Sequence, residues 1–402
     1  MSNLLSRSSG NSLVIIETHP IQYRAPVYRA LQQQYGVPVK VIYGSDFSVA
    51  GYYDPEFKSQ FAWDTDLLSG YSHAFLSLVA AGGGRNYESV SARGLASAIR
   101  AAEPAVILLP GYSPLFLQLA WFHAWRSGKP ILFRGETADQ PQSTSPVKRQ
   151  VRDHVLRHLY RKCAKLLYIG QRSKEHFLRY GCPPEKLAFS PYCVDPSPFQ
   201  TGEEERAGLR ERARAELAIN EGSTVLLFSG KISQRKGPDL LVDAVKSLAP
   251  VERRDLVMVF LGNGEMMPEI AAAAARDPHV SVRFPGFRNQ SELSRYFHAA
   301  DLLVLPSRRL ETWGLVVNEA LQHGLPCVVS EAVGCGPDLV VPGSTGEVFK
   351  TGSFYDLALA LSRAFALTRQ RETRDACRNK VADYSVARAA EGIAKAYADV
   401  VR

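Results

Sequence analysis

Short apolar runs alternate with longer helical patterns along most of the chain, and this alternation limits the fold more than any other feature. The runs expected to form strands are 13–16, 39–43, 105–109, 130–133, 165–169 and 187–190 in the first half, and 224–228, 256–261, 280–284, 302–305 and 326–329 in the second. Most of them are continuously apolar, as strands buried on both faces of a parallel sheet are. The pattern predicts an α/β fold with doubly wound sheets.

The length of the chain favours two domains. At 402 residues it exceeds what one ordinary core can cover. Residues 191–205 combine prolines with a glycine and a glutamate run, which is typical of a linker. We therefore expect an N-terminal domain over 1–199 and a C-terminal domain over 200–383, followed by an alanine-rich helix over 384–402.

The excess positive charge is confined to the first half of the chain. Residues 1–200 contain 22 Lys and Arg against 14 Asp and Glu, whereas residues 201–402 contain 26 of each kind. This asymmetry predicts an anionic partner for the first half, which is a phosphorylated acceptor, an acidic glycan or an anionic membrane surface.

Three features of the sequence indicate where in the cell the protein is located. No apolar run approaches the roughly 18 residues that a membrane-spanning helix needs, and the first residues lack the pattern of a signal peptide. The six cysteines show no metal-ligand spacing and are too few to staple a chain of this length. We expect reduced thiols and a cytoplasmic protein, with peripheral contact at the inner face of the cell membrane as an option.

A pair of glutamates in the segment 301–346 gives the strongest chemical signal. Glu311 lies in a loop after an apolar run, and Glu319 lies eight positions later, on a helix expected to begin near Gly314. Free amides at a helix start carry about half a positive charge, which suits a diphosphate. The two carboxylates can then hold hydroxyls on either side of that anion. Two solvated glutamates are the alternative, and the strand–loop–helix context favours the site.

A second signal lies in residues 228–241. An apolar run ends at Phe228, Gly230 permits a tight turn, and Lys231, Arg235 and Lys236 precede a helix. Cations at this place neutralise the charge that builds on a leaving diphosphate. Three solvated loop cations are the alternative. The position favours a binding role, because doubly wound sheets bind ligands outside the carboxyl ends of their strands.

These motifs resemble the nucleotide-binding domain of the retaining glycosyltransferase family 4, whose members have the two-domain GT-B fold. The family's two-glutamate motif coincides with Glu311 and Glu319, and its basic pair coincides with Lys231 and Lys236. Its glycine-containing loop coincides with Gly262-Asn263-Gly264, and its base-contacting loop coincides with Pro285-Gly286-Phe287. The resemblance is dense over 222–350 and extends to the first half only through the architecture.

The resemblance implies two Rossmann-like domains that face a central cleft, with the final helix packing back on the first domain. It assigns catalytic roles to Lys231 and Lys236 on the diphosphate and to Glu311 on the transferred sugar. The other candidate donor-binding residues, from the resemblance and the loop patterns together, are Gly230, Arg235, Gly262, Asn263, Gly264, Phe287, Thr312, Trp313, Gly314, Leu315, Val316 and Glu319. Glu319 would bind the ribose, and the backbone at Phe287 would contact the base. No metal or other cofactor is implied, since the nucleotide-sugar is a substrate.

The chain departs from the family pattern in its first half. The glycine-rich loop of the family is replaced by THPIQYRAP at 18–26, and FRGETAD at 133–139 stands where many members place a histidine. Our candidates for the sugar and acceptor side are therefore His19, Arg134 and Glu136. In the second half Lys231 stands where Arg is frequent, which keeps the charge and loses the bidentate fork.

Three other patterns carry less weight. Asp64 and Asp66 imitate a D-x-D metal motif, but the chain does not suggest the fold that uses it. Met267 stands where the third glycine of a dinucleotide fingerprint would fall, which speaks against a dehydrogenase. The basic segment 148–165 can dock on anionic lipid, or it is a core-facing helix with a solvated basic side. Its cations lack interleaved aromatic residues, so nucleic acid is not an expected partner.

The sequence thus predicts a metal-independent hexosyltransferase that moves a sugar from an NDP-sugar to an acceptor hydroxyl. A UDP-sugar is the favoured donor, and the family resemblance implies retention at the anomeric carbon. The acceptor is a glycan, a lipid-linked molecule or a small molecule, and envelope or exopolysaccharide biosynthesis is the favoured setting. A non-catalytic subunit that binds sugar nucleotides and a nucleotide-sugar epimerase remain alternatives.

Overall fold

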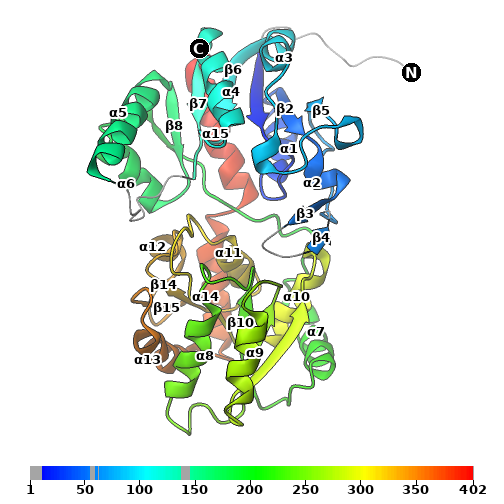
Figure 1. Ribbon diagram of the computed structural model, residues 1–402, viewed down its shortest axis with the longest axis vertical. Coiled ribbons are helices and arrows are strands. Elements are labelled where there is room, and N and C mark those ends of the chain that lie inside the picture. The colour runs from blue at the N-terminus through cyan, green and yellow to red at the C-terminus, as the bar shows by residue number, and fades with distance from the viewer. Residues whose placement is uncertain (1–10, 55–58, 62, 137–144, 402) are drawn as a thin grey trace. The chain divides into compact units, whose positions relative to one another are not determined.

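The computed structural model describes residues 11–54, 59–61, 63–136 and 145–401 (Figure 1). The chain divides into two compact units. The first comprises Met1–Tyr52, Asp66–Tyr192 and Val386–Arg402, and the second comprises Tyr53–Thr65 and Cys193–Ser385. Each unit contains its own parallel sheet and its own buried core. The predicted α/β fold with doubly wound sheets is confirmed.

The first unit is built on a seven-stranded parallel sheet of order β5-β2-β1-β6-β7-β8-β9. Its strands are β1 (Ser12–Glu17), β2 (Val39–Ser45), β5 (Ser72–Ser77), β6 (Pro104–Leu109), β7 (Ile131–Phe133), β8 (Lys165–Tyr168) and β9 (Leu187–Phe189). All six residues of β1 are buried, since helices cover both faces of the sheet. The strand order reverses direction beside β1, and in such sheets ligands bind at this switch point.

The helices of the first unit are α1 (Ala25–Gln34), α2 (Phe47–Ala50), α3 (Leu95–Ala102), α4 (Leu115–Arg126), α5 (Pro146–Lys162), α6 (Gln171–Arg179) and α15 (Val386–Val401), with short 3₁₀ turns at Val79–Ala81, Tyr87–Ser89 and Pro184–Lys186. The last helix, α15, packs against α1 and β9. A Cβ atom on Gly392 would lie 1.8 Å from the carbonyl oxygen of Phe189, so only glycine permits this close approach. The Ser190 hydroxyl donates a hydrogen bond of 2.9 Å to the carbonyl of Ala389.

The second unit is built on a six-stranded parallel sheet of order β12-β11-β10-β13-β14-β15. Its strands are β10 (Thr224–Ser229), β11 (Leu256–Leu261), β12 (Ser281–Gly286), β13 (Leu302–Leu305), β14 (Cys327–Ser330) and β15 (Gly346–Phe349). Its helices are α7 (Glu203–Glu216), α8 (Pro238–Ser247), α9 (Met267–Ala275), α10 (Gln290–Ala299), α11 (Leu315–Gln322), α12 (Gly336–Leu339), α13 (Phe354–Ala364) and α14 (Arg371–Ala382), with a 3₁₀ turn at Phe365–Leu367. The central strands are buried along their whole length, as the continuous apolar runs predict.

The unit boundaries differ from the expected domains at three places, one of which is the end of the second unit at Ser385 rather than at residue 383. The expected boundary between 199 and 200 lies at Tyr192–Cys193, and Tyr53–Thr65 belongs to the second unit rather than the first. This segment carries part of a two-stranded sheet formed by β3 (Tyr52–Asp54) and β4 (Ser59–Phe61). The Asp64 carboxylate accepts hydrogen bonds from the Ser291 backbone N–H at 3.2 Å and from its hydroxyl at 2.5 Å. These bonds anchor the segment to α10.

Across the described part of the chain, no helix combines the length and the apolar character needed to cross a bilayer. The six cysteines are all buried.

Candidate functional site

The predicted donor residues of the second unit lie on loops that leave the same edge of its sheet. β10 and β13 are parallel neighbours, so the loop after Ser229 and the loop after Leu305 emerge side by side at the carboxyl ends of the strands. The first loop carries Lys231, Arg235 and Lys236, and the second carries Glu311. This edge is where parallel α/β sheets bind ligands.

Arg308 ties the two loops together. Its backbone N–H donates to the carbonyl of Arg235 at 2.9 Å, and its guanidinium donates to the carbonyl of Gln234 at 3.1 Å. The same guanidinium forms a bidentate pair with Asp239, with N–O distances of 2.7 and 2.5 Å. Gly237 has a φ of +67°, and a Cβ there would lie 2.5 Å from the carbonyl oxygen of Pro306. The loops are therefore held in backbone contact.

Lys236 and Glu311 meet where the two loops touch. The Lys236 ammonium donates a hydrogen bond to Oε2 of Glu311, and the side chains are only 14% and 11% exposed. The same carboxylate oxygen accepts a bond of 2.9 Å from the buried Ser307 hydroxyl, and the Arg235 guanidinium lies 4.0 Å away. The structure thus brings together a cationic group and the first glutamate of the predicted pair.

The start of α11 is shaped by glycine. Gly314 has a φ of +100°, and a Cβ there would lie 3.0 Å from a methyl group of Val333. Trp313, one residue earlier, is buried, and its indole N–H donates a bond of 2.8 Å to the Asn318 side chain. The amides of Leu315 and Val316 are the first of the helix, where N–H groups have no acceptor within the helix. They are available to an anion.

The backbone around Glu311 and Thr312 is fixed by the next loop of the sheet. The Glu311 carbonyl accepts a bond of 2.9 Å from the Gly334 N–H, and the Trp313 carbonyl accepts one of 2.9 Å from Cys335. A Cβ on Gly334 would lie 1.9 Å from the Thr312 carbonyl oxygen. Glu311 is therefore held from both sides, by its backbone and by its carboxylate.

Glu319 lies on the second turn of α11 and is half-buried. Burial raises the pKa of its carboxyl to about 8. Within the residues that the structure describes, its side chain has no hydrogen-bond partner, whereas its carbonyl accepts a contact of 2.6 Å from the His323 ring. A neutral carboxyl both donates and accepts hydrogen bonds, which suits a vicinal diol.

The glycine-containing loop after β11 packs on the loop after β10. Gly262 has a φ of +136°, and a Cβ there would lie 2.0 Å from the carbonyl oxygen of Gly230. A Cβ on Gly264 would lie 2.2 Å from the carbonyl oxygen of Ile232, whose N–H donates to the carbonyl of Asn263 at 2.9 Å. Phe287 follows the end of β12, beside the same edge, since β12 pairs with β11. The predicted donor loops are thus all at one edge.

Four residues at this edge were not predicted from the sequence: Ser233, Asp239, Ser307 and Arg308. The Ser233 hydroxyl is buried, and among the described residues it has no hydrogen-bond partner. An orphaned buried hydroxyl in this loop is a candidate ligand contact. Ser307 and Arg308 directly follow β13, so the rule that ligands bind at the carboxyl ends of strands could have identified them.

In the first unit, Arg134 follows β7 and is 5% exposed. Its guanidinium donates to the carbonyls of Ser190 and Pro191 at 3.1 and 2.6 Å and lies 4.9 Å from the centre of the Tyr192 ring. Arg134 therefore holds the segment after β9 against the segment after β7. Its role on the sugar or acceptor side stays a prediction.

Glu136 lies in a polar cluster that the sequence did not indicate. Its Oε1 accepts hydrogen bonds from the hydroxyls of Tyr192 and Tyr23 at 2.6 and 2.9 Å, and from the Arg24 guanidinium at 3.3 Å. Arg24 is buried and also pairs with Glu17, at the end of β1, at 2.9 and 3.1 Å. Desolvation raises the pKa of Glu17, and the Arg24 charge opposes this shift.

His19 lies beside this cluster. Its Nδ1 is 2.8 Å from the Thr18 hydroxyl, and its ring packs on Phe47 with the centroids 4.2 Å apart. Burial, assisted by the Arg24 charge, lowers the pKa of His19 to about 3, so the ring is neutral at pH 7. A neutral imidazole can exchange hydrogen bonds with a hydroxyl but cannot supply a positive charge.

The two aspartates of the D-x-D pattern are engaged separately. Asp64 accepts hydrogen bonds from Ser291, and Asp66 accepts them from the backbone of Leu68 and Ser69 at 3.0 and 3.1 Å. Among the described residues, no group of three or more His, Cys, Asp or Glu side chains is arranged to hold a metal ion.

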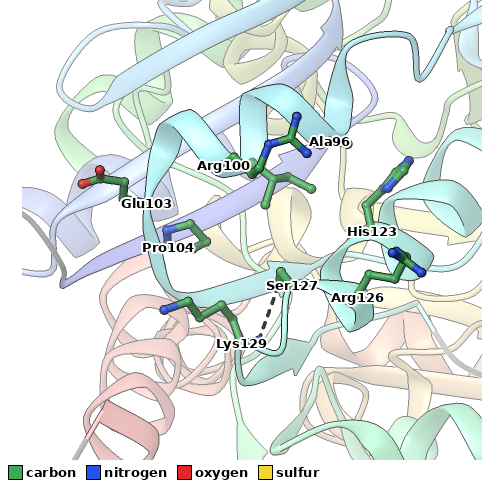
Figure 2. Close-up of a pocket in the computed structure, with 9 residues that line it drawn as sticks. Ala96, Arg100, Glu103, Pro104, His123, Arg126, Ser127 and Lys129 are labelled. Carbon is green, nitrogen blue, oxygen red and sulfur yellow. Dashed lines mark hydrogen bonds between the residues drawn. The ribbon is translucent and has the colours of Figure 1, made fainter.

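A cavity of about 930 Å³ lies in the first unit between α3 and α4. Figure 2 shows Arg100, His123, Arg126 and Lys129 around it, near the start of β6 at Pro104. The start of β6 is at the amino end of the sheet, opposite to the edge that carries His19, Arg134 and Glu136. None of the predicted site residues is among the described residues that line this cavity.

Comparison with protein families matches residues 210–383 to the model described as Glycosyl transferases group 1. The curated relatives include D-inositol 3-phosphate glycosyltransferases. That of Corynebacterium aurimucosum is 31% identical over 241 residues, which is 58% of this chain and 56% of the relative. That of Catenulispora acidiphila is 34% identical over 186 residues, 44% of this chain and 43% of the relative. The chain thus spans about half the length of the curated relatives it matches.

Solved structures are similar over nearly the whole chain. HepE from Anabaena in complex with UDP has a TM-score of 0.70 at 17% identity and covers 96% of this chain and 100% of its own. A glycosyltransferase from Rickettsia africae has a TM-score of 0.69 at 13% identity and covers 98% of this chain and 99% of its own. At these identities the likeness shows the fold alone, which is the GT-B fold with two parallel-sheet α/β domains.

Proposed function

We propose that this chain, whose residues 210–383 form a group 1 glycosyl transferase region, is a retaining glycosyltransferase of family 4. It transfers a hexosyl group from a UDP-sugar to an acceptor hydroxyl. HepE, whose fold it shares, has been crystallised with UDP and with UDP-glucose, which supports a uridine nucleotide as the donor.

The observation that carries this proposal is the contact between the Lys236 loop and the loop that leads into α11. Lys236 lies against Glu311, three residues before Gly314, so its charge and the first amides of α11 are near one another. A pyrophosphate needs both kinds of group, because cations and helix-start amides are its usual partners in proteins. Lys231 and the buried Ser233 hydroxyl extend the same loop and add further contacts for the diphosphate.

Glu311 and Glu319 bind the two parts of the donor that carry hydroxyl groups, which are the transferred sugar and the ribose. Glu311 is held by Ser307 and Lys236, and in the complex its carboxylate accepts hydrogen bonds from the transferred sugar. Glu319, on the helix behind the diphosphate, binds the ribose diol as a neutral carboxyl. Phe287 and its neighbours contact the base with backbone atoms.

In the reaction, the bond between the anomeric carbon and the phosphate oxygen breaks, and a bond from the acceptor oxygen to the same carbon forms. The electron pair of the broken bond stays on the nucleoside diphosphate, where Lys236, Lys231 and the helix-start amides stabilise it. The acceptor proton passes to the departing phosphate oxygen. No dedicated protein base and no metal is required in this scheme.

The carboxyl edge of the first sheet binds the acceptor. Glu136, oriented by Tyr23, Tyr192 and Arg24, accepts a hydrogen bond from an acceptor hydroxyl, and the neutral His19 provides a second polar contact. The acceptor in this proposal is a glycan or a lipid-linked molecule of an envelope or exopolysaccharide pathway, and the proposed location is the cytoplasm. A small-molecule acceptor is the second choice.

The test is a thermal-shift screen of UDP-, GDP- and ADP-sugars, followed by measurement of nucleoside diphosphate release with acceptor mixtures. A ligand that binds only the folded chain raises its melting temperature. We expect the largest shift with a UDP-sugar, and UDP release that depends on an acceptor. Binding without release would indicate a non-catalytic subunit, and an epimeric UDP-sugar formed without acceptor would indicate an epimerase. No shift with any sugar nucleotide would refute the proposal.

A further inference from the structure

Three helices of the first unit share one face of its sheet. α4 connects β6 to β7, α5 connects β7 to β8, and α6 connects β8 to β9, and these strands are successive neighbours in the parallel sheet. Right-handed crossovers that advance in one direction place their helices on the same face. Their inner sides also contribute to one core cluster. Their outer sides, which we call the α4–α6 face, therefore look away from the sheet together.

The outer side of α4 is apolar. Leu115, Leu119, Phe122 and Trp125 are 65%, 38%, 45% and 47% exposed and recur every three or four positions, so they form one stripe. The rings of Phe122 and Trp125 lie 6.4 Å apart. The opposite side of the helix already lies in the core. A second apolar side on a surface helix marks a contact surface.

The outer side of α5 continues this pattern. Val147, Val151 and Val155 are spaced four residues apart and are 68%, 60% and 53% exposed. Lys148, Arg157, Arg161 and Lys162 are exposed on the same helix. The exposed surface of α5 therefore combines apolar side chains with cations.

The positive charge of the first half is concentrated on these three helices. Together α4, α5 and α6 contain ten Lys and Arg against two acidic residues, Asp153 and Glu175. The rest of residues 1–200 contains twelve of each sign, so the helices account for the whole excess. Asp153 is engaged by the Tyr180 hydroxyl at 2.6 Å and by Arg152 at 3.7 Å. The cavity between α3 and α4 adds Arg100 and Lys129 near the end of α4 (Figure 2).

From these observations we infer that the α4–α6 face docks on an anionic lipid surface. Leucine, valine and aromatic side chains enter the boundary between head groups and acyl chains, while the exposed cations contact lipid phosphates. A second copy of the chain is a poorer occupant, because it would oppose two strongly positive faces. A nucleic acid offers no partner for the exposed leucines and valines. This docking is independent of the donor loops, which belong to the second unit.

The experiment is co-sedimentation of the full chain with vesicles of phosphatidylcholine alone or mixed with phosphatidylglycerol. The wild type should bind the mixed vesicles, and binding should fall with added salt. The double variant Arg157→Glu, Arg161→Glu should bind at least tenfold more weakly, since each cation near such a surface contributes about fivefold. Phe122→Ser, Trp125→Ser should also lose roughly tenfold or more, because both rings leave the interface.

Matched controls lie on the second unit. Tyr355→Ser, Leu359→Ser removes two apolar side chains that are 67% and 60% exposed on α13, and Arg371→Glu reverses a cation whose side chain is 75% exposed. These variants should bind vesicles as the wild type does, and all variants should keep their melting temperature and their UDP-sugar affinity. The inference would be overturned if the wild type did not bind mixed vesicles. It would also be overturned if the double variants on α4 and α5 bound these vesicles as well as the controls do. A dimer that Phe122→Ser, Trp125→Ser converts to a monomer would assign the face to a second copy instead.

Discussion

The Lys236 ammonium donates a hydrogen bond to the carboxylate of Glu311, 75 residues further along the chain. Both groups are largely buried, and Ser307 donates to the same carboxylate oxygen. Without a bound nucleotide-sugar, the charges of Lys236 and Glu311 neutralise each other. In the proposed function, a bound diphosphate gives Lys236 a second anionic partner, and a sugar hydroxyl gives Glu311 a further donor. The proposal therefore makes this pair the link between the phosphate side and the sugar side of the site.

The bidentate pair of Arg308 with Asp239 should act on donor binding by positioning the Lys236 loop. In Asp239→Asn the guanidinium keeps its backbone contacts but loses its ionic partner, so the loop becomes less ordered. We expect the donor KM to rise about tenfold, which corresponds to about 1.4 kcal/mol, with a smaller change in kcat. The control is Asp243→Asn, an exposed residue one turn later on α8. Equal KM values for the two variants would contradict this role.

Gly264→Ala should separate two of the donor loops. The added Cβ would lie 2.2 Å from the carbonyl oxygen of Ile232, and the backbone there cannot move without breaking the Ile232–Asn263 hydrogen bond. We expect a loss of about 2 kcal/mol in the free energy of unfolding, together with weaker UDP binding. Gly222→Ala is the control, since nothing lies within 4 Å of a Cβ at that position. An unchanged denaturation midpoint in Gly264→Ala would show that the loops are not packed as described.

Glu319 should make stability depend on pH. Its folded-state pKa is raised from 4.5 to about 8 by burial. Between these values the folded chain keeps a proton that the unfolded chain releases, so this contribution is complete below pH 4.5 and is lost as the pH rises toward 8. The variant Glu319→Gln carries no such proton. Relative to Glu319→Gln, the wild type should therefore lose melting temperature from pH 5 to pH 8. A constant difference between the two proteins would show that the carboxyl is not neutral.

Arg134 should prove mainly structural. In Arg134→Ala the carbonyls of Ser190 and Pro191 lose their buried donor, and we expect the free energy of unfolding to fall by about 3 kcal/mol. Arg93→Ala, at an exposed site of the same unit, is the control. Chemical denaturation of both variants measures the free energy of unfolding, which should fall in Arg134→Ala and not in Arg93→Ala. Unchanged stability with lost transfer would place Arg134 in contact with substrate instead.

Most of the sheet architecture could be predicted from the sequence, because central strands of a parallel sheet are continuous apolar runs. Within the two parallel sheets the strands that were missed are β5 and β15, and both lie at an edge of their sheet. The short strands β3 and β4 of the two-stranded sheet were missed as well. β5 consists of exposed and half-exposed residues. β15 begins with Gly346, whose φ is +156°, and contains Glu347, which interrupts the apolar run. Edge strands have one solvent-exposed side, so their sequences are not uniformly apolar.

The candidate site could likewise be predicted only in part from the sequence. The charged residues of two donor loops could be named from the sequence pattern, because each of these loops follows an apolar run. The loops at Gly262 and Phe287 were named only through the family resemblance. The contact of Lys236 with Glu311 requires that β10 and β13 are neighbours, and a sequence does not state its strand order. The cluster around Glu136 joins Arg24 to Tyr192, 168 residues apart, and neither residue lies in a motif. Polar networks of this kind depend on packing rather than on local pattern.

The central claim is that Lys236 and the start of α11 together hold a pyrophosphate. Calorimetric titration of UDP into the wild type, Lys236→Ala and the exposed-site control Lys350→Ala tests it most directly, with turnover of the UDP-sugar measured in parallel. Loss of one such group in a closed site lowers turnover about a hundredfold or more. We predict that Lys236→Ala keeps its fold, binds UDP much more weakly and loses turnover to this extent, while Lys350→Ala matches the wild type. A folded Lys236→Ala variant with unchanged UDP affinity and unchanged turnover would contradict the account.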